Sequence, residues 1–461
     1  MANQAPALRR WLQSESGLAL TLVLFFLALV VLWQYSGRGN ILSLGLAGVI
    51  AAGALLQWPI LGALYISFSI FGRVASFVPG IDTAIVVLTL LAYMARKLLD
   101  KDPTWRFPAS ARWALLFIAW LAASITWAEN AREGMQALVM YLKSFLIFLL
   151  VLEAAQDYRR VLSLIYAALA GAVFATLIAV YTGYRFFFSG AAAELSRVVT
   201  IQTTRLYGQW FDANYFALAL LALIGVAFGL WRSHTARAWK LAAGAGFASV
   251  VLGIVLTLSR AGMLSAFIAF LFLLRAERRR LRILLFVGCI IALVLLCLPI
   301  GLWERIETLA SGQADASLQI RGRLLQGGLE MAMDAFPFGV GLGNYFHHSL
   351  SYVKMSHPML SHNSYVDLMA EAGIVAVFLF AGFIISLFQT TLVARRFDPN
   401  ALDRNLAIGL RISLIAFLIG ATFLSAAVFG PLWWLAGIIA AKAVCDEDFR
   451  GQPLTASNRV M

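Results

Sequence analysis

The chain has 461 residues, of which 61% are hydrophobic and only 13% are charged. Soluble globular proteins are about half apolar and about a quarter charged, so this composition excludes a soluble globular chain. The net charge of +13 could suggest nucleic-acid binding, but the basic residues separate apolar runs of a length that spans a bilayer. The sequence therefore predicts a polytopic membrane protein, and we expect no nucleic-acid partner.

The apolar runs predict an all-α protein with about 12–14 transmembrane helices. Two weak pairs of short runs account for the lower count. No A-x-A cleavage site follows the first run, so we expect it to be retained as a helix rather than removed as a signal peptide. The expected spans are 17–34, 41–57, 60–78, 80–95, 113–128, 134–154, 161–182, 211–231, 241–258, 262–274, 283–300, 364–388, 405–424 and 431–444.

The basic residues predict the orientation of these helices. With a cytoplasmic N-terminus, Lys and Arg fall on the inner side about twice as often as on the outer side, as the positive-inside rule requires. Both termini are therefore predicted to be cytoplasmic. The two long connections, 183–210 and 301–363, then lie on the outer face of the membrane.

This topology divides the chain into four segments. Residues 1–200 hold the N-terminal helices and the first outer loop, and residues 201–300 hold core helices with arginines at their outer ends. Residues 301–363 form the large outer loop. Residues 364–461 hold the C-terminal helices and a cytoplasmic tail.

The large outer loop contains a predicted helix, roughly from Ser317 to Phe336. On a helical wheel Arg321 lies with the apolar residues, whereas Arg323 lies opposite with Glu330 and Asp334. Arg321 is therefore predicted to face the membrane domain and Arg323 to face water. The residues of the predicted apolar face are Arg321, Leu324, Leu325, Gly328, Ala332 and Phe336.

A proline and three alternating glycines follow this helix, at Pro337, Gly339, Gly341 and Gly343. Proline stops a helix, and glycine adopts the backbone conformations of tight turns. We expect the chain to turn sharply here.

Arginines near the outer face are the first candidate functional groups. Arg260 falls where one apolar run ends and the next begins with almost no loop. Placing a cation close to the membrane interior costs free energy, so a residue in this position is a candidate functional residue by default. Converging guanidinium groups suit a pyrophosphate, which makes Arg260, Arg321 and Arg205 the leading candidates. The alternative is that they reach lipid headgroups or pair with carboxylates such as Glu304 and Glu307.

His362 is the second candidate. It precedes a predicted transmembrane helix, and Ser364 with Asp367 has the spacing of a capping box at the helix start. The partial positive charge of a helix start disfavours imidazolium, so the ring is predicted to be a neutral base. Asp367 and Glu371 lie one turn apart on this helix, a costly pair within a membrane. The alternative is that His362 is an ordinary surface residue.

The outer histidines could also suggest a zinc site. Their spacing matches no standard ligand pattern, and no cysteine lies on the outer face, so we expect neither a metal nor a cofactor. These histidines are His347, His348, His357 and His362.

Several motifs stand out over roughly residues 200–380. They are Arg205 to Asn214, Leu256 to Gly262, Arg321-Gly322-Arg323, Phe336 to Asn344, and His362-Asn363 followed by nine residues and Gly373. With these motifs the chain resembles the O-antigen ligase and O-antigen polymerase superfamily of bacterial membrane glycosyltransferases. Ala376 stands where ligases usually carry Gly, Thr or Tyr, which keeps the polymerase alternative open.

The resemblance implies a GT-C-like, metal-independent glycosyltransferase of the bacterial inner membrane with its site on the periplasmic face. The implied donor is a glycan on undecaprenyl diphosphate. The acceptor would be lipid A–core in a ligase, our leading prediction, or another glycan in a polymerase, or a protein in an O-oligosaccharyltransferase. By resemblance, Arg260 and Arg321 bind the diphosphate and His362 serves the acceptor hydroxyl. Further substrate-binding candidates are Arg205, Arg323, Asn363, Asp367 and Glu371.

Elementary chemistry agrees with this assignment. Fixed cations can stabilise a dianionic leaving group in place of Mg²⁺, and a neutral histidine can remove the proton of the attacking hydroxyl. Attack from the side opposite the diphosphate inverts the anomeric carbon. A lipid-linked glycan transporter would need a polar path into the cytoplasmic half of the membrane. An envelope assembly protein would not need Arg260 or His362 at membrane depth.

Overall fold

The structure is a computed structural model, and it describes residues 53–76, 80–99, 107–188, 210, 212–234, 236–276, 280–281, 284–285, 287–289, 292, 316–397 and 401–451. Throughout these residues the chain forms helices and no strand, so the all-α prediction is confirmed. The α-helices are α4 (Ile60–Gly72), α5 (Ile81–Leu99), α6 (Ala109–Ser124), α7 (Ala131–Ala154), α8 (Tyr158–Phe188), α10 (Ala213–Ser233), α11 (Arg237–Leu256), α12 (Arg260–Ala276), α15 (Ala316–Asp334), α16 (Tyr345–Tyr352), α17 (Ser364–Phe397), α18 (Ala401–Gly420) and α19 (Gly430–Gly451). Short 3-10 turns are η1 (Val74–Ser76), η2 (Ile125–Trp127) and η4 (Ala421–Phe423).

Seven stretches of the described residues are long and apolar enough to cross a membrane, and each overlaps one predicted span. The polytopic class is therefore confirmed. The expected spans 17–34, 41–57 and 283–300 lie wholly or mostly outside the described residues, so the count of 12–14 stays a prediction. The seven stretches are Ala109–Trp127, Ala131–Ala154, Tyr158–Thr182, Ala213–Ser233, Arg237–Leu256, Ser364–Leu392 and Leu402–Phe423.

Helix α10 is the centre of the bundle, and most of its residues are buried. It crosses α18 at Gly225 and Gly409, where a Cβ on either glycine would lie 2.2–2.3 Å from the carbonyl oxygen of the other. Small residues let two helix backbones approach closely, which is how membrane helices gain packing energy. The α10–α18 pair is thus a rigid support for the connections at its ends.

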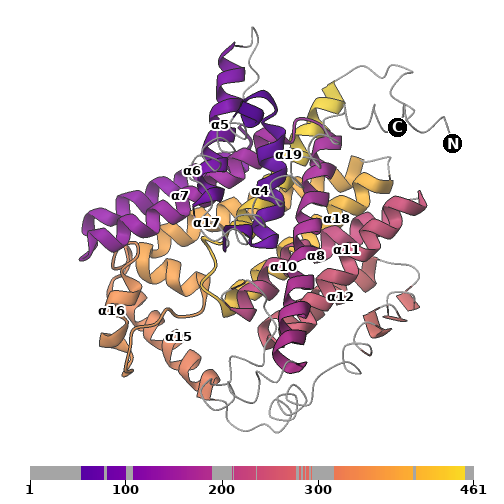
Figure 1. Cartoon of the computed structure of the whole chain (residues 1–461). Coiled ribbons are helices and arrows are strands. Elements are labelled where there is room, and N and C mark those ends of the chain that lie inside the picture. The colour runs from indigo at the N-terminus through magenta and orange to yellow at the C-terminus, as the bar shows by residue number, and fades with distance from the viewer. Residues whose placement is uncertain are drawn as a thin grey trace, which may run out of the picture.

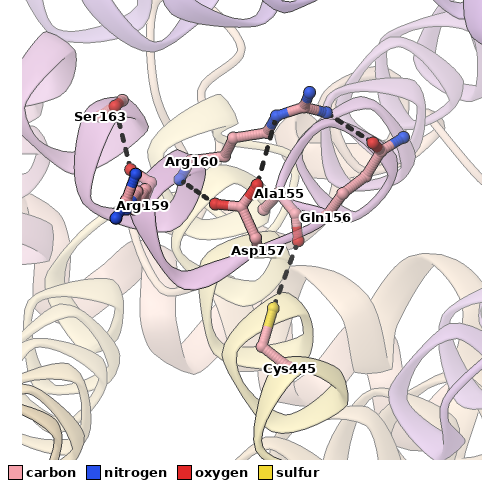
Figure 2. A network of polar contacts seen from close by, with 7 residues as sticks. All are labelled: Ala155, Gln156, Asp157, Arg159, Arg160, Ser163 and Cys445. Atoms are coloured by element: carbon pink, nitrogen blue, oxygen red, sulfur yellow. Dashed lines mark hydrogen bonds and ion pairs between the residues drawn. The ribbon is translucent and has the colours of Figure 1, made fainter. Parts of the chain in front are cut away.

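Contacts at one end of the bundle join connections that the topology places in the cytoplasm. Figure 2 shows Asp157 accepting a hydrogen bond from the backbone N–H of Arg160 (2.9 Å) at the start of α8. In the same view Cys445 of α19 donates to the Ala155 carbonyl (3.5 Å). An ion pair also joins α5 and α7 at their ends on this side.

Contacts at the other end join connections that the topology places outside. The backbone N–H of Asn130 donates to the side-chain oxygen of Asn344 (2.7 Å), and Ser364 donates to the Leu424 carbonyl (2.6 Å). In Figure 1, α15 and α16 lie together at the lower left beside α17, whereas α5 reaches the top of the view. These contacts agree with the predicted division into two faces; which face is cytoplasmic stays a prediction.

Helix α17 is broken at Gly373, which adopts φ 72°. The carbonyls that lose helical partners at the break are bonded by the loop that follows α15. The carbonyls of Ala370 and Glu371 accept hydrogen bonds from the N–H groups of Val340 (2.9 Å) and Gly341 (2.7 Å). The loop therefore replaces one turn of helical hydrogen bonds, and it fixes the outer loop to a membrane-spanning helix.

The three alternating glycines are required by this docking. Gly339, Gly341 and Gly343 all have positive φ, at 77°, 96° and 74°. A Cβ on Gly339 would lie 2.6 Å from the carbonyl of Glu371, and one on Gly343 would lie 2.7 Å from the carbonyl oxygen of Glu133. The predicted sharp turn is present, and only glycine fits its conformation and its contacts.

Helix α15 forms where the sequence predicted it, but its buried face is rotated from the predicted one. The face of α15 that is buried against the rest of the protein includes Gly327 and Met331, which were not on the predicted face. Leu325 and Phe336 were predicted on the buried face and are exposed, so the prediction was wrong for these two. The apolar residues of α15 occupy a wider arc of the helix than the bundle can bury. The bundle therefore covers one side of that arc and leaves the other side exposed. The residues that are buried are Leu324, Gly327, Gly328, Met331 and Ala332.

Candidate functional site

Asp212 begins the site at the outer end of α10. Its carboxylate caps the helix by accepting hydrogen bonds from the N–H groups of Asn214 (2.6 Å) and Tyr215 (3.3 Å). A carboxylate at a helix start is stabilised by the exposed N–H groups and by the helix dipole. The sequence around Asp212 thus fixes a negative charge at the outer end of the central helix.

The α11–α12 connection places Arg260 next to this helix end. Leu258 takes a left-handed conformation (φ 47°), and the buried Ser259 accepts a hydrogen bond from the N–H of Gly262 (3.1 Å). Ser259 also donates to the side chain of Asn214 (2.7 Å), which ties the connection to α10. Arg260 is the first residue of α12, and its side chain is exposed. The predicted near-absence of a loop is therefore confirmed.

Arg321 reaches the same region from α15. Burial lowers the pKa of the half-buried guanidinium; Asp212 opposes this shift and Arg260 adds to it. Arg321 therefore lies within electrostatic reach of both a carboxylate and a second cation. Arg323, two residues later, is exposed to solvent, as the wheel predicted.

His362 lies beside Arg321 in the turn before α17. It is half-buried, with a left-handed backbone (φ 55°), and none of the described residues hydrogen-bonds its buried Nδ1 atom. Burial lowers the pKa of the ring, the charge of Arg321 lowers it further, and Asp212 acts in the opposite direction. Burial and Arg321 thus favour the neutral ring, whereas the sequence analysis had attributed that preference to the helix start.

The start of α17 is capped differently from the prediction. The side-chain oxygen of Asn363 accepts hydrogen bonds from the N–H groups of Tyr365 (3.0 Å) and Val366 (3.2 Å). Asn363 is therefore the helix cap, and it directly follows His362 in the chain.

The expected capping box between Ser364 and Asp367 does not form. Ser364 donates to a carbonyl of the α18–α19 connection, and Asp367 accepts hydrogen bonds from both the N–H (3.1 Å) and the hydroxyl (2.6 Å) of Ser361. The capping box is absent because Asn363, one residue before Ser364, is the cap of the helix. The N–H of Asp367, which Ser364 would bond in a capping box, instead donates to the carbonyl of Asn363 (3.0 Å). Asp367 instead closes the turn that carries His362.

Glu371 lies one turn further along α17 and is almost fully buried. Its carboxylate accepts a hydrogen bond from the N–H of Tyr345 (3.2 Å), at the start of α16. Glu371 therefore fixes the start of α16 to α17, whereas Asp367 fixes the turn that carries His362. For both residues, a role in substrate binding stays a prediction.

The site thus combines four residues that are far apart in the sequence: Asp212, Arg260, Arg321 and His362. Asp212 was not among the predicted site residues, although it is an acidic residue before a predicted helix and lies within the motif Arg205 to Asn214. Arg205 lies outside the described residues. In the part of the chain that the structure describes, no group of three or more His, Cys, Asp or Glu could hold a metal ion.

The fold and the site define a polytopic membrane protein that has two guanidinium groups and a neutral imidazole at one end of its helical bundle. Residues 245–381 match the family model described as O-antigen ligase. This stretch contains Arg260, Arg321 and His362. The match supports the predicted resemblance to the O-antigen ligase and polymerase superfamily. A comparison with curated proteins gives no match.

Proposed function

We propose that the chain is a glycosyltransferase that moves a glycan from undecaprenyl diphosphate to an acceptor hydroxyl on the periplasmic face of the bacterial inner membrane. One observation carries the proposal: Arg321 lies within electrostatic reach of Arg260, Asp212 and His362. Two cations beside a neutral base are the groups that transfer from a glycosyl diphosphate requires.

The arginines would bind the diphosphate. Arg260 and Arg321 repel one another, and this repulsion contributes to the lowered pKa of Arg321. An anion between them relieves that repulsion and gains charge-assisted hydrogen bonds from both. As the glycosidic bond breaks, the leaving diphosphate gains negative charge, and the same guanidinium groups stabilise it without a metal ion.

His362 would act as the base. The acceptor oxygen forms a bond to the anomeric carbon, the bond from that carbon to the diphosphate breaks, and the hydroxyl proton passes to the imidazole. Asp212 favours the protonated ring, since it raises the pKa of His362, and so it stabilises the imidazolium that forms. Attack opposite the leaving group inverts the anomeric configuration.

The acceptor in our leading proposal is lipid A–core, which makes the chain an O-antigen ligase. A polymerase or a protein O-oligosaccharyltransferase would use the same chemistry on another acceptor. A transporter is less well supported. It needs helix breaks that open a polar path, whereas the break at Gly373 is filled by the backbone of the loop after α15.

The surface glycans of a deletion strain test the proposal. Accumulation of unligated, lipid-linked polymer indicates a ligase, and accumulation of single repeat units indicates a polymerase. The wild-type gene should restore the glycans, and a gene encoding His362→Ala should not. An unchanged glycan profile in the deletion strain would overturn the proposal.

A further inference from the structure

Helix α15 has three faces rather than two. At about 100° per residue, its buried residues, its exposed polar residues and a set of exposed apolar residues are centred about a third of a turn apart. The polar set consists of Arg323, Gln326, Glu330 and Asp334. The exposed apolar set of the helix consists of Leu325 (37% exposed), Leu329 (45%) and Met333 (66%). Phe336 (59% exposed), in the turn after the helix, extends this set, and the four residues are here called the apolar row.

The apolar row ends at a membrane boundary. Phe338, two residues beyond Phe336, packs against Trp127 (5.8 Å between ring centroids) and Trp120 (6.3 Å). Trp127 is the last residue of the membrane-crossing stretch Ala109–Trp127. Tryptophan at the end of a transmembrane helix marks the level of the lipid headgroups.

The row also continues onto a membrane-spanning helix. The carbonyl of Pro337 accepts a hydrogen bond from the N–H of Ile374 (3.0 Å), which fixes the end of the row against α17. Ile374 (40% exposed) and Phe378 (63% exposed) then carry the exposed apolar surface along α17. One exposed apolar surface therefore runs from the apolar row onto a helix that is long and apolar enough to cross a membrane.

We propose that α15 lies in the membrane interface beside the bundle, with Leu325, Leu329 and Met333 in contact with lipid acyl chains. A helix in this position needs one face for the protein, one for lipid and one for water, which is the division that α15 has. Its polar face mixes acidic and basic residues, so apolar area rather than charge attraction holds it at the membrane.

This position sets the depth of Arg321. Arg321 precedes Leu325 by one helical turn, so it lies at the edge of the row and not on the wet face. Its guanidinium is then at the level of lipid headgroups. The lipid contact itself does not depend on the transferase proposal, because it concerns only where α15 lies.

Nitroxide accessibility tests the proposal. In the full chain, with Cys289, Cys297 and Cys445 changed to alanine, single variants Leu329→Cys, Met333→Cys, Glu330→Cys and Asp334→Cys are labelled. Each is placed in nanodiscs of phosphatidylethanolamine and phosphatidylglycerol. Collision rates are measured with oxygen, which concentrates in lipid, and with a water-soluble nickel chelate.

Positions 329 and 333 should collide more with oxygen than with nickel, and positions 330 and 334 should show the reverse order. All four residues are exposed, so labelling should leave the fold intact, and the melting temperature of each variant checks this. Nickel-dominated collisions at 329 and 333 would place the row in water and overturn the proposal. Low collision rates with both reagents would show that protein covers the row, and would overturn it equally.

Discussion

Arg321 and Arg323 are separated by one residue but have different surroundings. Arg321 is half-buried beside Asp212 and Arg260, and Arg323 faces solvent. The comparison of these two arginines therefore separates the site from general positive charge on the outer loop.

We expect Arg321→Ala to reduce transfer about ten- to a hundredfold, the loss of one charge-assisted contact worth about 1.5–3 kcal/mol. Arg323→Ala should retain most of the activity, because its side chain is exposed on the polar face of α15. Initial transfer rates of the two purified variants, with melting temperature as a folding control, check this. Equal losses in well-folded protein would mean that the assigned helix face is wrong.

The surroundings of His362 predict opposite pH shifts for two neighbouring variants. A base works above its pKa, so the rate of the wild type should fall as the pH drops through the lowered pKa of His362, below 6.5. Arg321→Gln removes a charge that lowers this pKa, so the acid limb should move to higher pH. Asp212→Asn removes a charge that raises it, so the limb should move to lower pH.

Normalised pH–rate profiles of the two variants measure these shifts, and Arg323→Gln, on the exposed face, is the matched control. Shifts in the same direction for Arg321→Gln and Asp212→Asn would contradict the assigned electrostatics of the site.

Sequence reasoning found part of the site, and the reason lies in the kind of signal each residue gives. Arg260 stood out because a cation at membrane depth is costly, and His362 stood out because it directly precedes a predicted transmembrane helix. Asp212 did not, since an acidic residue before a helix is an ordinary cap. The supporting roles of Asp367 and Glu371 depend on partners, Ser361 and the start of α16, that only the fold brings to them.

At the scale of single elements, the clearest case is the break in α17. The hydropathy of this stretch is continuous, so the sequence predicted one uninterrupted span, 364–388. The break at Gly373 exists because the loop after α15 supplies the missing hydrogen bonds from about 30 residues upstream. No local pattern in the sequence predicts these distant hydrogen bonds, although Gly373 belongs to the motif that begins at His362-Asn363.

This docking predicts different effects for two Gly→Ala changes. A Cβ at Gly373 would lie 2.0 Å from the Pro337 carbonyl oxygen, and φ there is 72°. Gly373→Ala should therefore destabilise the protein by at least about 1–3 kcal/mol, the cost of a strained backbone alone. Gly322 has nothing within 4 Å of its Cβ position and lies in a helix, so Gly322→Ala should be neutral or stabilising.

Melting temperatures of the two variants in the same detergent make the comparison. A Gly373→Ala variant as stable as wild type would show that the kink does not require glycine.

For the whole molecule, the positions of the helices along the chain were largely predictable, because a bilayer imposes apolar runs of a fixed length. Their arrangement was not. The sequence does not reveal that α10 and α18 pair at the centre through Gly225 and Gly409, since that contact depends on the shapes of two distant surfaces.

The topology predicts that both termini and the basic clusters Arg278–Arg280 and Arg395–Arg396 are cytoplasmic, whereas 301–363 is periplasmic. A cysteine at Ser311 should react with a membrane-impermeant thiol reagent in cells whose inner membrane is intact. A cysteine at Arg396 should react only after that membrane is permeabilised. The reverse pattern would invert the predicted orientation.

Donor binding and transfer, measured side by side in excess EDTA, test the central claim most directly. The proteins are the wild type, His362→Ala, His362→Gln and Arg260→Ala, each purified in nanodiscs with a glycan on undecaprenyl diphosphate. The wild type should transfer the glycan in EDTA. Both His362 variants should bind the donor normally but lose transfer by about 10²–10⁴-fold, since a general base acts in the transition state. Arg260→Ala should lose both donor affinity and transfer. Near-normal transfer by His362→Gln, or wild-type transfer that stops in EDTA and returns with Mg²⁺, would contradict the account.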